Sequence, residues 1–466
     1  MAKARIGLLP LYLKLYDDQP DGPGRRPRNE EFVHTIAAEL EKRGLEVVAA
    51  PVCRIEKEFA AAVRRLEAAD VDALVTLHLA YSPSLESSDV LARTRLPVIV
   101  LDTTPTWSYA ADQDPDELMY NHGIHGVQDM CNLLLRNGKR FLIEVGHWQK
   151  SDVLDRVAAH VLPARMAAAM RRGKVGMLGT AFKGMGDFFV PAAKIRSSIG
   201  ASVKSMDRET LQKFLAAVKP ADVEREVAAD GARFDFDKEG VSPEAHARSV
   251  KLGLAVRRWA EKEGLSALTF NFLNMTKKDG YMTAPFLEMS KAMERGLGYA
   301  GEGDTLTALL VGALSAGFPD TSFTEMFCPD WEHDSLFLSH MGDVNPRLLA
   351  GRPKLWEMDY HYSATDNPAL VVGRFKPGDV VFVNLAPTAA GYRLVIAPAV
   401  MLDVPGVDRM WDTIRGWFKP RLAVPDFLSA YSRVGGTHHL AVTYARDTRP
   451  FELFGYLMGW DVTVIQ

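Results

Sequence analysis

The chain has few cysteines and no long apolar run, and both absences narrow the class of protein that it can be. Three cysteines, Cys53, Cys131 and Cys328, occur in 466 residues. Three widely spaced thiols provide neither a disulfide framework nor a Cys-x-x-Cys metal site, so we expect a reducing, cytoplasmic location. The longest apolar stretch with a helical pattern, residues 306–318, is far shorter than the roughly 20 residues that a membrane span needs.

The sequence also lacks a strong excess of charge and the common nucleotide-binding motifs. Its 55 basic and 59 acidic residues give a formal net charge of −4, and no segment carries a long basic run. Nucleic acid or an anionic membrane is therefore not the expected partner. The loop after the first predicted strand, residues 11–14, has no glycine fingerprint, and no GxxxxGK[ST] loop occurs. These absences disfavour a dinucleotide or nucleoside triphosphate site.

Length and patterning indicate two or three packed units with a large core. The composition, 47% hydrophobic and 24% charged, is typical of a globular protein. In the first third of the chain, β-branched runs such as residues 72–77 alternate with helical patterns such as 55–69, which predicts a parallel, doubly wound α/β sheet. A second α/β segment follows, where Ser242 caps a long helix that starts at Pro243 and ends at Gly264.

The pattern changes after about residue 318. Short β-rich runs then dominate, and helical periodicity is limited to residues 409–417 and 449–458. This part is predicted to be an antiparallel barrel or sandwich. We therefore expect an N-terminal α/β domain over residues 1–170, a central α/β domain over 171–318 and a C-terminal β-rich domain over 319–466.

The segment with the clearest chemistry is residues 301–304. Glu302 stands between two glycines, which leave room for a ligand to approach. Asp304 is suited to cap the helix that follows. The alternative is structural, because an acidic residue at this position also interacts favourably with the helix dipole.

Three further positions offer metal-ligating groups. Glu325 lies in an apolar run, where a carboxylate is either exposed on a strand edge or paired with a cation. His340 ends another apolar run, where a satisfied core histidine is the commoner outcome. A glycine-rich turn delivers the pair His438 and His439 to a buried strand. Two carboxylates and two imidazoles would suit Mn²⁺, Mg²⁺ or Co²⁺ better than a thiolate-type zinc site.

Taken in chain order, these segments resemble the metal-site motifs of the L-arabinose isomerase family, which is related to the L-fucose isomerases. The resemblance rests on residues 299–304, 321–325, 338–341 and 435–439, and on two N-terminal segments at 121–126 and 145–148.

The resemblance implies a divalent ion, Mn²⁺ or alternatively Co²⁺ or Mg²⁺, held by Glu302, Glu325, His340 and His439. It implies an aldose–ketose isomerase in which the two glutamates, Glu302 and Glu325, carry the proton transfers. It also implies two α/β domains followed by a C-terminal β-barrel, and homo-oligomers, trimers or hexamers, with active sites at subunit boundaries. His125 would then bind the sugar from a neighbouring chain.

The chain departs from the family at positions that face the sugar. Residues 10–14 replace a polar Ser-Gln-His stretch, Met326 and Phe327 replace an Asp-Tyr pair, and the interval from Glu325 to His340 is shorter. These departures favour a deoxy or modified sugar over L-arabinose, in an apolar pocket formed by Tyr81, Phe272 and Phe327. The alternatives are a metal-dependent sugar epimerase or lyase, and a non-catalytic or sensory sugar-binding protein on the same scaffold.

Overall fold

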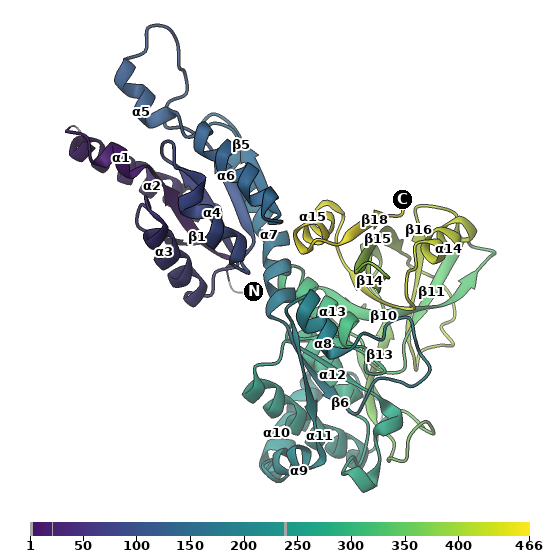
Figure 1. Ribbon diagram of the computed structural model, residues 1–466. Helices are drawn as coiled ribbons and strands as arrows, with labels where there is room; N and C mark the ends of the chain where they lie inside the picture. The colour runs from purple at the N-terminus through teal and green to yellow at the C-terminus, as the bar shows by residue number, and fades with distance from the viewer. Residues whose placement is uncertain (1–2, 21, 237–239) are drawn as a thin grey trace. The chain divides into compact units, whose positions relative to one another are not determined.

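The structure is a computed structural model that describes residues 3–20, 22–236 and 240–466. Two compact units are distinguished (Figure 1): unit 1 is Met1–Ala168 with Tyr456–Gly459, and unit 2 is Ala169–Gly455 with Trp460–Gln466. No helix within the described residues is long and apolar enough to cross a membrane. Our division of the chain into three domains stays a prediction.

Unit 1 contains a parallel five-stranded sheet in the order β2-β1-β3-β4-β5. The strands are β1 (Arg5–Leu11), β2 (Glu46–Ala49), β3 (Ala73–His78), β4 (Val98–Asp102) and β5 (Phe141–Val145). All six residues of β3 are buried, as expected where helices cover both faces of a parallel sheet. The main connecting helices are α2 (Gly22–Lys42), α3 (Glu56–Ala68), α4 (Ser84–Arg93), α6 (Ile124–Arg136) and α7 (Val153–Arg172).

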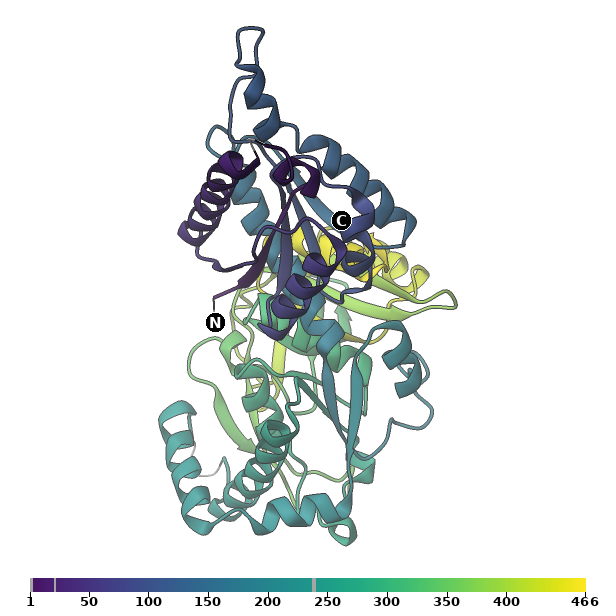
Figure 2. The same cartoon turned by 60° about the vertical axis from the view of Figure 1, so that its left-hand side comes forward.

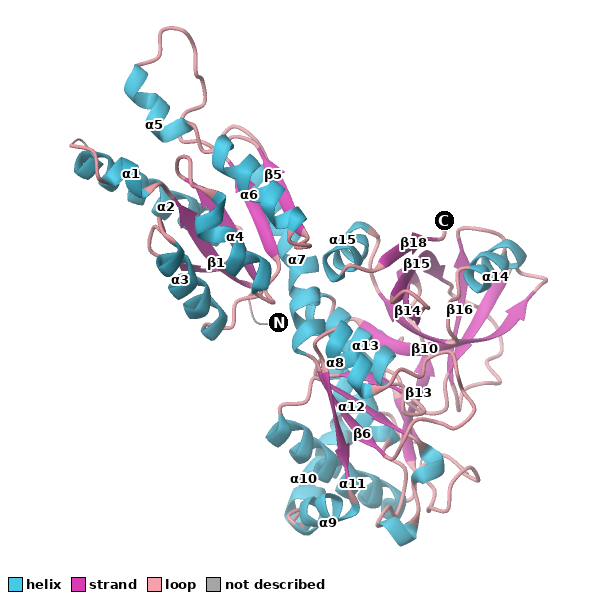
Figure 3. Cartoon of the chain, in the orientation of Figure 1, coloured by secondary structure: helices cyan, strands magenta, loops and turns pink. Residues whose placement is uncertain are grey.

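Unit 2 begins with a second parallel sheet, in the order β7-β6-β8-β9. Its strands are β6 (Lys174–Leu178), β7 (Ser202–Met206), β8 (Ala267–Phe270) and β9 (Gly298–Ala300). The helix α11 (Pro243–Glu263) has the predicted ends: the Ser242 hydroxyl accepts a hydrogen bond from the Ala245 backbone N–H at 3.2 Å, and Gly264 adopts φ 61°. Helices flank the sheets (Figures 2 and 3), and the predicted doubly wound α/β arrangement is confirmed.

The C-terminal part of unit 2 is a closed six-stranded antiparallel barrel. Its strands are β10 (Thr321–Asp330), β11 (Ser335–Ser339), β14 (Gly378–Pro387), β15 (Tyr392–Met401), β16 (Ile414–Pro420) and β17 (His439–Thr443). Around the barrel they follow the order β16-β11-β10-β17-β14-β15, and the pairing of β15 with β16 closes it. The barrel, rather than the sandwich, is therefore confirmed. Three short strands, β12 (Lys354–Glu357), β13 (Ala369–Arg374) and β18 (Asp461–Val464), extend the sheet.

The helices of this part agree only in part with expectation. The predicted helix at 449–458 is present as α15 (Arg449–Met458). The predicted helix at 409–417 is wrong, because Ile414 already begins β16 and the residues before it form turns. The helix α14 (Val424–Arg433) was missed, although Val424, Phe427 and Tyr431 are buried at helical spacing.

Candidate metal centre

Three neighbouring barrel strands bring one glutamate and two histidines together. Glu325 on β10 lies opposite His439 of β17 on one side and opposite Ser339 of β11 on the other. Directly paired residues of antiparallel strands point to the same face of the sheet, so Glu325 and His439 face the same space. His340 follows the last residue of β11 and enters from the other side of Glu325.

The second glutamate comes from the central sheet. Glu302 follows β9 and adopts φ 55°, a left-handed conformation that is uncommon for a residue with a side chain. Gly303 continues this turn with φ 79°, and a Cβ atom there would lie 2.6 Å from Cα of Ala181, so only glycine fits. Asp304 then caps α13 (Thr305–Gly317) by accepting a hydrogen bond from the Thr307 backbone N–H at 2.9 Å. The turn holds the carboxylate of Glu302 close to the two barrel histidines.

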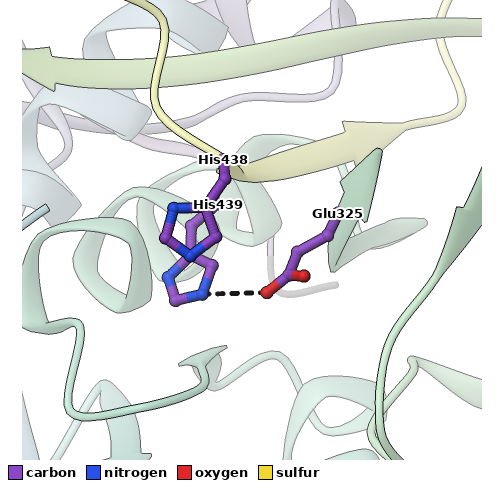
Figure 4. Close-up of side chains that lie close together, drawn as sticks. All are labelled: Glu325, His438 and His439. Atoms are coloured by element: carbon purple, nitrogen blue, oxygen red, sulfur yellow. Dashed lines mark ion pairs between the residues drawn. The ribbon is translucent and has the colours of Figure 1, made fainter. Parts of the chain in front are cut away.

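The four residues predicted as metal ligands lie close together. Nε2 of His439 is 3.0 Å from Oε2 of Glu302 and 2.9 Å from Oε1 of Glu325. Nε2 of His340 is 3.5 Å from Oε1 of Glu325 and 3.8 Å from Oε1 of Glu302. Glu302 and both histidines are buried, and Glu325 is half-buried. Figure 4 shows the contact between His439 and Glu325.

Each imidazole is backed by a carboxylate on its far side. Nδ1 of His439 donates a hydrogen bond to Oδ2 of Asp304 at 2.9 Å, and Nδ1 of His340 donates to Oδ1 of Asp343. With Nδ1 bonded in this way, Nε2 is the atom of each ring that faces the two glutamates. Asp304 was predicted only as a helix cap and Asp343 was not predicted at all, although its position three residues after His340 was an available signal.

Aromatic rings fix the orientation of the two imidazoles. Phe188 stacks on His439 with a centroid distance of 4.7 Å and an interplanar angle of 10°. Phe323 meets both histidines edge-on, at 4.6 Å from His340 and 5.0 Å from His439. The rings therefore have little freedom to turn away from the glutamates.

The electrostatics of the cluster favour bound positive charge. Burial alone would raise the pKa of Glu302 and of Glu325, but the two imidazoles outweigh it and lower the pKa of both carboxyls. Burial disfavours the charged histidines, yet the surrounding carboxylates hold the pKa of His340 and of His439 well above the usual value. Positive charge between these carboxylates therefore stabilises the cluster, and either protons or a metal ion can supply it.

The donor set fits a divalent ion. Ligand atoms of Glu302, Glu325 and His340 lie within 4.8 Å of one another. Oε2 of Glu302 and Nε2 of His439 are buried, and neither has a partner in hydrogen-bond geometry among the residues that the structure describes. Two carboxylates and two imidazoles around such atoms are the mixed oxygen and nitrogen ligation that suits Mn²⁺, Co²⁺ or Mg²⁺.

His438, the neighbour of His439, offers a second possible ligand. Glu325, His438 and His439 also have ligand atoms within 4.8 Å of one another (Figure 4). Nδ1 of His438, however, lies 2.7 Å from Oδ2 of Asp187, which also accepts the His438 backbone N–H at 3.0 Å. This contact, which sequence reasoning missed, ties His438 to the loop that carries Phe188.

A cavity of about 510 Å³ is lined by Glu302, Glu325 and His340, three of the four predicted ligands. Phe272 and Phe327, predicted to bind substrate, both line it. The cavity is further lined by the apolar side chains of Met185, Met341, Met358, Val372 and Ile414. Tyr81 and His125 belong to unit 1, where the Tyr81 hydroxyl donates to Asp129 at 3.2 Å and His125 lies in the first turn of α6. Their part in substrate binding stays a prediction.

Comparison with known proteins gives a consistent result. Residues 192–316 match the L-arabinose isomerase central domain and residues 320–461 match the L-arabinose isomerase C-terminal domain, together more than half of the chain. L-arabinose isomerase of Oceanobacillus iheyensis is 26% identical over 370 residues, which cover 76% of each chain. L-arabinose isomerase of Geobacillus thermodenitrificans is 24% identical over 456 residues, 94% of this chain and 90% of the relative.

A solved periplasmic solute-binding protein from Actinobacillus succinogenes, with bound D-allose, is 14% identical and covers 67% of this chain and 91% of its own, but its TM-score of 0.17 is too low to bear on fold or function. The fold, the acidic and histidine cluster and the relatives define an enzyme of the aldose–ketose isomerase class, an intramolecular oxidoreductase. The chain belongs to the L-arabinose isomerase family, as a divergent member.

Proposed function

We propose that this isomerase is metal-dependent and that Glu302, Glu325, His340 and His439 hold one divalent ion, with Mn²⁺ preferred and Co²⁺ or Mg²⁺ as alternatives. The observation that carries the proposal is the convergence of two carboxylates and two Nε2 atoms, with each imidazole held by a further carboxylate. When bound, the ion would supply Lewis-acid stabilisation of negative charge on the substrate oxygens.

The two glutamates supply the proton transfers of a 1,2-isomerisation. One carboxylate removes the proton from the carbon next to the carbonyl, and the electrons of that C–H bond form the enediol. The other carboxylate moves the hydroxyl proton from one of the two neighbouring oxygens to the other. A proton then returns to the former carbonyl carbon. Glu302 and Glu325 divide these steps between them, and the lowered pKa of each carboxyl keeps it ionised.

We further propose that the substrate is a deoxy or otherwise modified sugar rather than L-arabinose. The apolar side chains of Phe272, Phe327 and Met341 line the cavity, and they favour a methyl or methylene group over a hydroxyl. We also propose a homo-oligomer, a trimer or hexamer, in which His125 completes the site of a neighbouring chain, in line with the family resemblance. Three cysteines without disulfides support a cytoplasmic enzyme.

The proposed function is tested by turnover of a panel of aldoses in D₂O. With Mn²⁺ present, we expect a 1,2-isomer that carries deuterium at C1 or C2, full loss of activity with EDTA and recovery with Mn²⁺. Deoxy and modified sugars should react with a higher kcat/KM than L-arabinose. Turnover without deuterium would indicate a hydride shift, a product that is not a 1,2-isomer would indicate an epimerase or lyase, and a preference for L-arabinose would refute the substrate proposal.

Asp304→Asn is expected to weaken Mn²⁺ binding about 10- to 100-fold, because the neutral amide no longer orients and polarises His439. Asparagine caps helices as well as aspartate does, so α13 should stay intact. Isothermal titration calorimetry measures the affinity and circular dichroism the helix content. Asp207→Asn, which changes the cap of α9 (Arg208–Ala216), is the matched control. Equal Mn²⁺ affinity in the two variants would contradict an orienting role for Asp304.

A further inference from the structure

The charged side chains that line the cavity are mainly acidic. Among the described residues that line it are three carboxylates, Glu302, Glu325 and Asp412, and two histidines, but no lysine and no arginine. Glu302 and Glu325 are accounted for by the metal centre. Asp412 is not.

Asp412 lies half-buried in the connection between β15 and β16, two residues before β16 begins. Asp412 lines the cavity, and its carboxylate forms no ion pair or hydrogen bond with any residue in the described part of the chain. Its carboxylate oxygens are not among the buried unpartnered atoms, so they are open to solvent and to a ligand in the cavity. A free carboxylate can accept hydrogen bonds from such a ligand.

The backbone around Asp412 is held in place by a buried arginine that pairs with a different acid. Arg415 is 8% exposed, and its Nε donates to Oδ2 of Asp408 at 2.7 Å. Its Nη1 lies 3.4 Å from the carbonyl oxygen of Trp411 and 2.9 Å from that of Thr413. Because these carbonyls flank Asp412, the arginine fixes the segment without neutralising the Asp412 carboxylate.

The neighbouring ring adds to this rigidity. The indole of Trp411 packs edge-on against Trp356 of β12 at 4.8 Å, with an interplanar angle of 86°. Nζ of Lys354 lies 4.5 Å from the centre of the Trp411 ring, so this cation too is directed to the tryptophan. Asp412 is thus preorganised at the cavity wall, as a residue that binds a small ligand must be.

We propose that Asp412 is a specificity-determining residue that binds the end of the sugar remote from C1 and C2. A carboxylate accepts paired hydrogen bonds from neighbouring hydroxyls, or a charge-assisted bond from an amino group. It repels a carboxylate or phosphate at the same place, and no lysine or arginine among the described lining residues offsets that repulsion. The substrate class is therefore neutral or amino sugars and excludes sugar acids and sugar phosphates. This inference rests on the proposed function, since it takes the metal centre as the reacting end.

The test combines kinetics with Mn²⁺ content. For a neutral aldose, Asp412→Asn is expected to raise KM about 10- to 100-fold, as for loss of a hydrogen bond to a charged group, with little change in kcat or bound Mn²⁺. Asp412→Lys should shift the ratio of kcat/KM toward the matching uronic acid. The control is Asp403→Asn in the same connection, where the exposed carboxylate pairs with Arg374 at 3.2 Å and does not line the cavity.

Binding of inhibitors separates this inference from the proposed function. Calorimetry on the Mn²⁺-loaded enzyme compares neutral pentitols with the matching aldonates. If an aldose is isomerised but Asp412→Asn leaves KM and the preference for neutral sugars unchanged, the inference about Asp412 is wrong and the proposed isomerase function is unaffected. If no aldose is isomerised, weaker pentitol binding by Asp412→Asn than by the unchanged protein still supports the role of Asp412. Equal binding by these two proteins, or no pentitol binding by either, overturns that role.

Discussion

Glu302→Gln is expected to lower kcat/KM by about 10³-fold or more and to reduce the amount of bound Mn²⁺. The substitution removes one anionic ligand and one of the two groups proposed to move protons, and a positioned acid–base group alone contributes about 10²- to 10⁴-fold. The amide is close in size to the carboxylate. The left-handed turn at Glu302 and Gly303, and the cap of α13, should therefore remain.

Activity, Mn²⁺ content by mass spectrometry and the circular dichroism spectrum are measured on the same preparation. Glu332→Gln makes the same chemical change at an exposed position in the turn between β10 and β11, and should keep full activity. Glu302 is not part of the site if the Glu302→Gln protein is folded, binds Mn²⁺ normally and turns over at the rate of the unchanged enzyme.

Lys291→Met is expected to give the largest loss of stability, about 3–5 kcal/mol, because the buried carboxylate of Asp230 and the half-buried one of Glu226 lose the cation that they share. Lys291 on α12 (Phe286–Glu294) is 1% exposed. Its Nζ lies 2.8 Å from Oε1 of Glu226 and 2.7 Å from Oδ2 of Asp230, and Asp230 is fully buried. Both acids belong to α10 (Pro220–Arg233), so the lysine links two helices of unit 2.

Thermal unfolding followed by tryptophan fluorescence measures the loss, and about 10 °C in Tm is expected for a domain of this size. Lys213→Met, at an exposed site on α9, is the control. Burial alone would raise the pKa of Glu226. The positive charges of Arg257 and Lys291 have the larger effect and lower this pKa to about 2. The stability from Glu226 is therefore present above pH ~4.3 and lost as the pH falls toward 2. In Lys291→Met, this loss of stability should occur at a higher pH. An unchanged Tm and an unchanged acid transition would refute the stabilising role of Lys291.

Much of the fold could be predicted because its signals are local. Ser242, Pro243 and Gly264 marked the ends of α11, since capping depends only on adjacent residues. The false helix at 409–417 arose because Trp411, Ile414 and Trp417 repeat every three residues. In the structure only the last two lie on β16, while Trp411 packs against Trp356 from a turn. Tertiary contacts, which no local window contains, decide such cases.

The candidate site was predicted only as far as its motifs could be matched in order. Glu302, Glu325, His340 and His439 were found through the family resemblance, since each residue alone is equally compatible with a structural role. Their supporting groups were missed for a physical reason. The contact of Asp187 with His438 spans 251 positions, and that of Asp304 with His439 spans 135, so only the fold brings them together.

The register of β10 has an evolutionary consequence. Because β10 is paired on both edges, a slip of one residue would turn Glu325 to the opposite face and away from His439. Insertions and deletions within the strand are therefore selected against, whereas the exposed turn at 331–334 tolerates them. The segment between Glu325 and His340 already holds such an irregularity, because the register of β10 against β11 shifts between Met326 and Cys328. Glu325 nevertheless stays opposite both His439 and Ser339, so a change of chain length in this segment need not disturb the alignment of the two ligands across the sheet.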